Sequence, residues 1–312
     1  MRLGYENELF LLAIDHRTSL RRLLGAGDVT SADVTATLED AKRLVHEGFV
    51  RAIEHGAPKH HCGLLIDEEL GAEVARAAKA AGHLVALAVE RSGQQVFELE
   101  YGDAFGEHIE AINPDFVKVL VRWNPGDPQP VREEQGARLR QLSDWLHTND
   151  RRLLFELLVP PTDADLAQVD GDRNRYDVAL RPALTLTAVE QLRSQQVEPD
   201  VWKIEGFERR EDCVRLGRLI REGDGRELVT AVVLGRGADT TAVDRWLRAA
   251  APVDGYHGFA IGRSIWADAV VSHLAGKLHR DDARTRIAAA FRRFIEVYRA
   301  ASEALDADEV LE

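Results

Sequence analysis

The chain has 312 residues, of which 45% are hydrophobic, and carries a formal net charge of −13 at pH 7. This composition provides for a large core, and the length suits an α/β barrel, which commonly forms one domain of roughly 250 residues or more. The acidic balance disfavours nucleic acid or an anionic membrane surface as a partner.

Eight short apolar runs predict buried strands, and polar residues close each run. The runs cover 9–14, 63–66, 83–89, 115–121, 152–159, 199–206, 228–234 and 257–261. Helical spacing of apolar residues predicts helices between them, at 34–55, 72–81, 102–112, 131–148, 185–196, 209–222 and 240–250, with a largely helical region at 267–303. Short runs that are apolar throughout are typical of a parallel sheet covered on both faces.

Eight strands alternating with helices favour a closed (β/α)₈ TIM barrel over an open sheet. We therefore expect one α/β domain over residues 1–303, with an extra C-terminal helix, followed by an acidic tail at 304–312. The polar connection at 161–181 is long for a loop between a strand and a helix, and such loops often carry function.

The cysteine count and the N-terminus predict a cytoplasmic protein. Cys62 and Cys213 are the only cysteines and lack the spacing of a disulfide framework. Acidic residues follow Arg2, and Asp15 and Arg17 interrupt the apolar run, which is not the layout of a signal peptide. No apolar segment approaches the ~20 residues that span a bilayer.

The strand at 199–206 carries a lysine between apolar neighbours. Side chains alternate across a strand, so Trp202 and Ile204 face one way and Lys203 the other. If helices cover the tryptophan side, Lys203 points into the barrel. Lost hydration there favours a neutral, nucleophilic amine.

Two neighbouring strands repeat this pattern. Lys118 lies between Val117 and Val119, and Glu156 lies in the same way inside an apolar strand. An isolated buried charge is costly, so Lys118, Glu156 and Lys203 are expected to share one site. A core ion-pair cluster without chemistry is the alternative. In a site, Lys118 would lower the pKa of the neighbouring amine, and Glu156, helped by Asp15, would move protons.

Strands seven and eight end in Gly-Arg sequences that suit a phosphate group. Glycine lets backbone N–H groups approach the ligand, arginine binds phosphate through two N–H groups, and these two loops form the usual phosphate site of a barrel. The predicted binding residues are Gly235, Arg236, Gly237, Gly262 and Arg263, with Arg17 and Arg122 at the ends of strands one and four.

The constellation resembles the class I, Schiff-base aldolases of the deoxyribose-phosphate/tagatose-bisphosphate aldolase superfamily, in which the lysine of strand six forms the imine. A closer resemblance, over nearly the whole chain, is to the aldolase-like C-terminal domain of bacterial 5-dehydro-2-deoxygluconokinases. It rests on the segments IDHR, IDEELG, FELEYGDAFGEHIE, FVKVLVRWNP, LLFELLVPPT, PDVWKIEG, VVLGRGAD and GFAIGRS.

The resemblance implies reversible cleavage of a ketose phosphate to dihydroxyacetone phosphate and an aldehyde, with Lys203 as the Schiff-base lysine and no metal or organic cofactor. In inositol catabolism the substrate would be 2-deoxy-5-keto-gluconate 6-phosphate. His16 stands where the tagatose-bisphosphate group typically has glutamine, and LGRGA stands where that group has a Ser-Ala-Gly turn. Because of these departures the identity of the substrate stays open, and a sulfosugar phosphate is another candidate. A homo-oligomer is also left open.

Two other functions fit part of the pattern. Five carboxylates could hold Mg²⁺ at the barrel mouth of a metal-dependent lyase, namely Asp15, Asp67, Glu90, Glu156 and Glu205. A non-catalytic barrel could bind a sugar phosphate through the arginines alone. Residues 60–62, His-His-Cys, are residue types that bind metal ions, but they precede strand two and are expected on the barrel face away from the site. The 161–181 connection could close over an anion through Arg173, Arg175, Tyr176 and Arg181.

Overall fold

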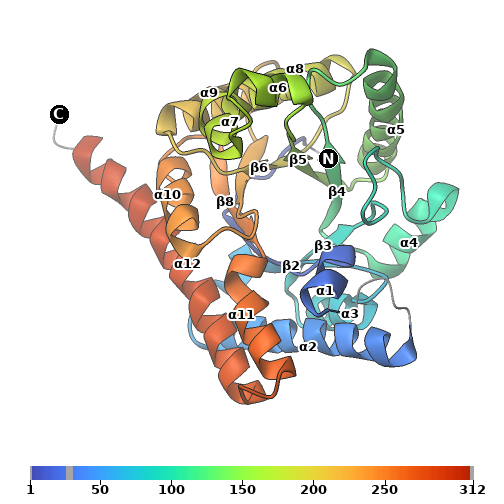
Figure 1. The fold of residues 1–312 in the computed structure, drawn as a ribbon, viewed down its shortest axis with the longest axis vertical. Coiled ribbons are helices and arrows are strands. Elements are labelled where there is room, and N and C mark those ends of the chain that lie inside the picture. Colours follow the sequence, from blue (N-terminus) through green and yellow to red (C-terminus); the bar gives the residue numbers. More distant parts are fainter. Residues whose placement is uncertain (1, 26–30, 310–312) are drawn as a thin grey trace.

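The computed structural model describes residues 2–25 and 31–309, in which eight parallel strands close into a barrel inside a ring of helices (Figure 1). Each strand pairs with the next along the chain, and the last pairs with the first, so the predicted (β/α)₈ barrel is confirmed. The strands are β1 (Leu9–Ala13), β2 (Cys62–Asp67), β3 (Leu84–Ala88), β4 (Phe116–Arg122), β5 (Arg152–Leu158), β6 (Val201–Glu205), β7 (Thr230–Leu234) and β8 (Tyr256–Ile261).

The helices cover the outside of the barrel. They are α1 (Thr18–Leu23), α2 (Ala32–Glu54), α3 (Ala72–Ala80), α4 (Phe105–Ile112), α5 (Gln129–Thr148), α6 (Asp163–Gln168), α7 (Arg173–Ala179), α8 (Arg181–Ser194), α9 (Arg210–Arg221), α10 (Thr240–Ala250), α11 (Arg263–Leu274) and α12 (Arg280–Glu309). Two short 3-10 turns, Lys59–His61 and Gly102–Ala104, precede β2 and α4.

Three stretches differ from the prediction. Helix α1 follows β1 directly, and the polar connection at 161–181 contains α6 and α7. The region predicted as largely helical, 267–303, is divided into α11 and α12, with Gly276 in the left-handed conformation (φ +69°) after α11. Helices α6 and α7 are too short to show an apolar period, and local caps begin them: Thr162 and Asp165 form a reciprocal capping box at α6.

Side-chain alternation along the strands separates two apolar regions. Outward-facing residues such as Trp202, Phe155 and Val117 pack against the helices. Inward-facing residues fill the barrel interior: Leu9, Leu11, Ala13, Leu65, Ala86, Phe116, Leu154, Val201, Val232 and Ala260. Lys118, Glu156 and Lys203 follow the inward set on β4, β5 and β6, as predicted, so the interior changes from apolar to charged towards the carboxyl ends of the strands.

Helix α12 crosses the outside of the barrel against α2, α10 and α11 (Figure 1). Gly48 of α2 allows close approach, because a Cβ atom there would lie 2.6 Å from Cγ2 of Ile287. The helix continues past residue 303, so the predicted tail starts within α12, and its residues 310–312 lie outside the described range. Within the described ranges, no helix is both long and apolar enough to cross a membrane.

Candidate active site

A cavity of about 540 Å³ opens at the carboxyl ends of the strands. Ten of the residues predicted for the site line it: Asp15, Arg17, Arg122, Glu156, Lys203, Gly235, Arg236, Gly237, Gly262 and Arg263. Lys118 has no exposed surface and lies beneath the cavity, in contact with Glu156. Arginine and lysine outnumber aspartate and glutamate in the lining by eight to five, although the chain as a whole is strongly acidic.

Glu156 lies between the two lysines predicted for the site. Its Oε2 atom accepts a hydrogen bond from Nζ of Lys203 at 3.0 Å and lies 2.9 Å from Nζ of Lys118. Burial disfavours the charged carboxylate, but the two ammonium groups outweigh burial and lower the pKa of Glu156. The carboxylate is therefore ionised and compensates both lysines. The predicted coupling of Lys118 to the amine of Lys203 stays a prediction.

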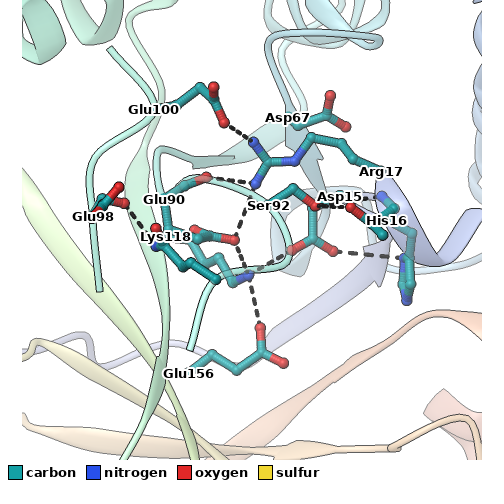
Figure 2. A network of polar contacts seen from close by, with 12 residues as sticks. Asp15, His16, Arg17, Asp67, Glu90, Ser92, Glu98, Glu100, Lys118 and Glu156 are labelled. Carbon is teal, nitrogen blue, oxygen red and sulfur yellow. Dashed lines mark hydrogen bonds and ion pairs between the residues drawn. The ribbon is translucent and has the colours of Figure 1, made fainter. Parts of the chain in front are cut away.

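Lys118 is enclosed by three carboxylates (Figure 2). Its Nζ lies 2.6 Å from Asp15, 2.9 Å from Glu156 and 3.0 Å from Glu90. Burial acts to lower the pKa of this amine, but the three negative charges prevail and raise it. The pKa of Asp15 is lowered in return, because Lys118 and Lys203 outweigh its burial. Lys118 is therefore a fixed positive charge, and it is Lys203 that presents an amine to the cavity.

Arg17 supports the loop after β3. It is only 4% exposed and donates to the backbone carbonyl of Glu90 at 2.6 Å, and it pairs with the carboxylates of Glu90 and Glu100 at 3.4 and 3.2 Å (Figure 2). Burial raises the pKa of Glu90 despite Lys118 and Arg17. The guanidinium thus has partners within the wall, and its expected contact with substrate stays a prediction.

A buried lysine that the sequence analysis missed holds the loop after β1. Lys42 of α2 is fully buried and pairs with Asp67 at the end of β2. It also donates to the backbone carbonyls of Ile14 and His16, the latter at 3.1 Å. A signal was present in the sequence, because Lys42 follows Leu38 by four residues and so falls on the buried face of its helix.

Of the two arginines in the predicted phosphate loops, one forms ion pairs with carboxylates and the other has no carboxylate partner among the described residues. Arg236 lies in a left-handed turn (φ +53°) and pairs with Glu205 at 2.9 Å and Asp177 at 2.7 Å. Arg263 opens helix α11 and donates to the backbone carbonyl of Arg236 at 3.1 Å, and it pairs with no carboxylate among the described residues. Gly237, also left-handed (φ +71°), lies against the Arg263 guanidinium.

The other predicted residues are divided between the cavity and its surroundings. Arg122 lines the cavity and donates to the carbonyl of Gln94 at 2.6 Å. Arg173 and Tyr176 of the connection between β5 and α8 also line it, with the Tyr176 hydroxyl donating to Val159 at 2.7 Å. Arg181 instead donates to backbone carbonyls behind the wall, at Glu205 and Gly206.

Each acidic residue considered for Mg²⁺ is paired with a cationic side chain. Asp67 pairs with Lys42 and does not line the cavity, whereas Asp15 and Glu156 contact ammonium groups. Across residues 2–25 and 31–309, no group of three or more histidine, cysteine, aspartate or glutamate side chains is placed to hold a metal ion. The histidines at 60 and 61 lie in a short turn before β2, as expected.

Three solved structures share the architecture. Fructose-bisphosphate aldolase from Plasmodium falciparum aligns with a TM-score of 0.66 at 11% identity, covering 94% of this chain and 91% of its own. A Schiff-base-forming fructose-1,6-bisphosphate aldolase aligns with a TM-score of 0.55 at 14% identity, covering 94% of both chains. A structural-genomics protein from Corynebacterium glutamicum gives 0.51 at 15% identity, covering 92% and 88%.

At such identities, these neighbours establish the TIM-barrel fold and nothing finer. No curated protein matches the sequence. A protein-family model, however, matches residues 2–302, nearly the whole chain. The chain therefore belongs to the family described as "Uncharacterized protein conserved in bacteria (DUF2090)".

Proposed function

We propose that this protein is a class I aldolase that cleaves a ketose phosphate through a Schiff base on Lys203. The observation that carries the proposal is a lysine only 2% exposed that nevertheless lines a cavity and contacts one ionised carboxylate, Glu156. A buried amine so placed can attack a ketone carbon, and the iminium that results withdraws electrons from the adjacent C–C bond. This chemistry needs no metal or organic cofactor.

The neighbours of Lys203 suit this chemistry. Glu156 contacts Nζ at 3.0 Å, so it can take up and return the protons that move when the carbinolamine forms and loses water. Lys118 lies behind it, paired with Asp15, and stabilises the ionised state of Glu156, while the charge of Asp15 acts against that ionisation. An iminium at Lys203 would face the same carboxylate.

The part of the cavity lined by the loops after β7 and β8 suits a phosphate group. Arg263 lacks a carboxylate partner among the described residues, and Gly262 and Arg263 stand at the N-terminal end of helix α11, where backbone N–H groups favour an anion. Gly235 and Gly237 complete this side of the lining. The surplus of basic over acidic lining residues supports a small anionic substrate inside an acidic protein.

The substrate favoured by the resemblance to the aldolase-like domain of 5-dehydro-2-deoxygluconokinases is 2-deoxy-5-keto-gluconate 6-phosphate of inositol catabolism, and a sulfosugar phosphate is the second candidate. The fold shared with two aldolases supports the reaction class. Cys62 and Cys213 are both buried free thiols, which supports the proposed cytoplasmic location.

Borohydride trapping tests the proposal. The protein is incubated with dihydroxyacetone phosphate and EDTA, reduced, and mapped by peptide mass spectrometry. We expect one adduct, on Lys203. No adduct on the wild-type protein, or an adduct on another lysine, would contradict the proposal. Activity that EDTA abolishes would point to a metal-dependent lyase, and phosphate binding without turnover to a binding protein.

Substitution of the amine provides the matched variants. Lys203→Met should abolish the adduct and lower retro-aldol turnover by several orders of magnitude, because the covalent route is lost. Lys277→Met, at an exposed lysine after α11, should change neither. Turnover of Lys203→Met within tenfold of the wild type would rule out the Schiff-base role.

A further inference from the structure

His16 occupies the wall of the cavity directly after Asp15, in the connection from β1 to α1. Its side chain is 18% exposed, and its Nδ1 atom is fully buried without a hydrogen-bond partner among the described residues. The exposed part of the ring therefore lies on its other side, towards the cavity. The nearest charged group to Nδ1 is the carboxylate of Asp15, at 3.8 Å (Figure 2).

The imidazole ring is fixed by packing. Trp266 meets it edge to face with ring centroids 5.3 Å apart, and the indole N–H of Trp266 is itself tied to the carbonyl of Ala13 at 2.9 Å. Gly262 leaves room for the ring, because a Cβ atom there would lie 2.7 Å from Cε1 of His16. Lys42 holds the backbone carbonyl of His16. The ring contacts Trp266 and Gly262 while its backbone is held by Lys42, so the imidazole has a defined orientation in the cavity.

His16 differs from the carboxylates around it in its protonation state. Burial lowers its pKa to about 4, with Arg263, Lys203 and Lys42 acting in the same direction and Asp15 against it. The imidazole is therefore neutral at pH 7, with one N–H to donate and one lone pair to accept a proton. Asp15 and Glu156, in contrast, are held ionised by ammonium groups.

We propose that His16 is a further catalytic residue, the base that removes the proton from the substrate hydroxyl when the carbon–carbon bond breaks. This inference rests on the proposed aldolase function. Nδ1–H directed towards Asp15 would leave the lone pair of Nε2 for the substrate, and the Asp15 carboxylate would stabilise the imidazolium once it forms.

The step balances without a further reactant. Glu156 takes a proton from the Lys203 ammonium group, the neutral amine condenses with the ketone, and return of that proton gives the iminium and one water molecule. The hydroxyl proton moves to Nε2, the hydroxyl-bearing carbon becomes the aldehyde carbonyl, and the electron pair of the broken C–C bond passes to the iminium as an enamine. Return of the proton from His16 to the enamine carbon and hydrolysis of the new iminium release the second product and restore the enzyme.

His16→Gln separates this role from imine formation. The amide keeps polar atoms of similar reach but cannot act as a base near neutral pH. We expect the trapped adduct on Lys203 to form as in the wild type, while retro-aldol turnover falls about 10²- to 10⁴-fold, the range of general base catalysis. His279→Gln, at an exposed histidine, is the control and should match the wild type in both assays.

Two further measurements distinguish a base from a packing residue. Added imidazole should partly restore turnover to His16→Ala. The kcat/KM of the wild type should fall below about pH 4, where His16 is protonated, and this acidic limb of the pH profile should be absent in His16→Gln. His16→Gln turnover within fivefold of the wild type, or loss of the adduct in a folded variant, would overturn the assignment. A wild-type protein that forms no adduct would instead overturn the proposed function.

Discussion

Glu156 contacts two ammonium groups through one oxygen atom, so the charge balance of the site depends on the neighbours of Lys203 as much as on Lys203 itself. Lys118 compensates more negative charge than Lys203 does, because Asp15, Glu90 and Glu156 all lie within 3.0 Å of its Nζ. Removal of a partner from a buried ion-pair group costs more than the pair itself contributes, because it leaves charge without compensation.

Lys118→Met is therefore expected to lower the free energy of unfolding by about 3–5 kcal/mol at about pH 7.5. Without Lys118 the folded-state pKa values of the buried carboxyls rise above their ordinary values. Stability of the variant is then retained at acid pH and lost as pH rises through those raised pKa values, so the deficit should shrink at about pH 5.

Urea unfolding of Lys118→Met at both pH values measures this. Lys79→Met is the control, because Lys79 pairs with Asp115 at a site 28% exposed and should contribute no more than about 1 kcal/mol. An equal deficit at both pH values would show that the loss comes from packing and not from charge.

The inward direction of Lys118, Glu156 and Lys203 could be predicted because strand alternation is local and the outward neighbours are large and apolar. The ion pairs of Arg17 and Arg236 could not, since their partners are brought close by loops far apart in sequence. The proposed role of His16 could not be predicted from an apolar pattern either, because it depends on a ring orientation fixed by Trp266, which is distant in the sequence.

At the scale of elements, the connection from β5 to α8 is fastened to the barrel rim. Asp177 of α7 pairs with Arg236, which also pairs with Glu205 at the end of β6. Tyr176 adds its hydrogen bond to Val159. The segment is thereby held at the cavity, where Arg173 and Tyr176 form part of the lining.

Arg236→Met should loosen this segment. We expect amide hydrogen exchange in Arg173–Ala179 to accelerate roughly three- to tenfold, in line with exposed ion pairs worth about 1 kcal/mol. Arg175→Met is the matched control, because Arg175 pairs with Asp170 inside the same connection and leaves the barrel contact intact. Equal exchange in the two variants would mean that Arg236 does not hold α7.

Strand positions followed from the sequence to within a few residues, because each strand is a short apolar run between polar ends. Helices α6 and α7 did not, since a helix of six or seven residues has fewer than two full turns in which to show a period. The break after α11 depends on one glycine in a left-handed conformation, inside a stretch with helical composition on both sides.

At the scale of the molecule, the C-terminal helix α12 packs against α2, near the N-terminus of the chain. Ile287, Phe291 and Phe294 of α12 are buried, and Ile287 fits against Gly48 of α2. Arg280 of α12 also forms ion pairs with Glu47 and Asp40 of α2. The C-terminal helix is therefore part of the barrel's outer layer.

Gly48→Val should cost about 1–3 kcal/mol of unfolding free energy, because the new side chain meets Ile287 within 3 Å. Ile287→Ala alone should cost about 2–5 kcal/mol by leaving a cavity. In the double variant the valine fills part of that cavity, so the combined loss should be smaller than the added losses. Denaturant unfolding of the three variants gives the coupling, and strict additivity would show that the two positions do not share the contact.

The charged groups beneath the cavity come from β1, β3, β4, β5 and β6 and their ends, and the first of them, Asp15, is 188 residues before the last, Lys203. Glu156 and Lys203 are neighbours across β5 and β6, whereas Asp15 follows β1, which pairs with neither of these strands. The whole group of charges is enclosed only when β1 pairs with β8 and the cylinder closes. The complete pocket around the Lys203 amine therefore exists only in the closed barrel, with the last strand, β8, in place.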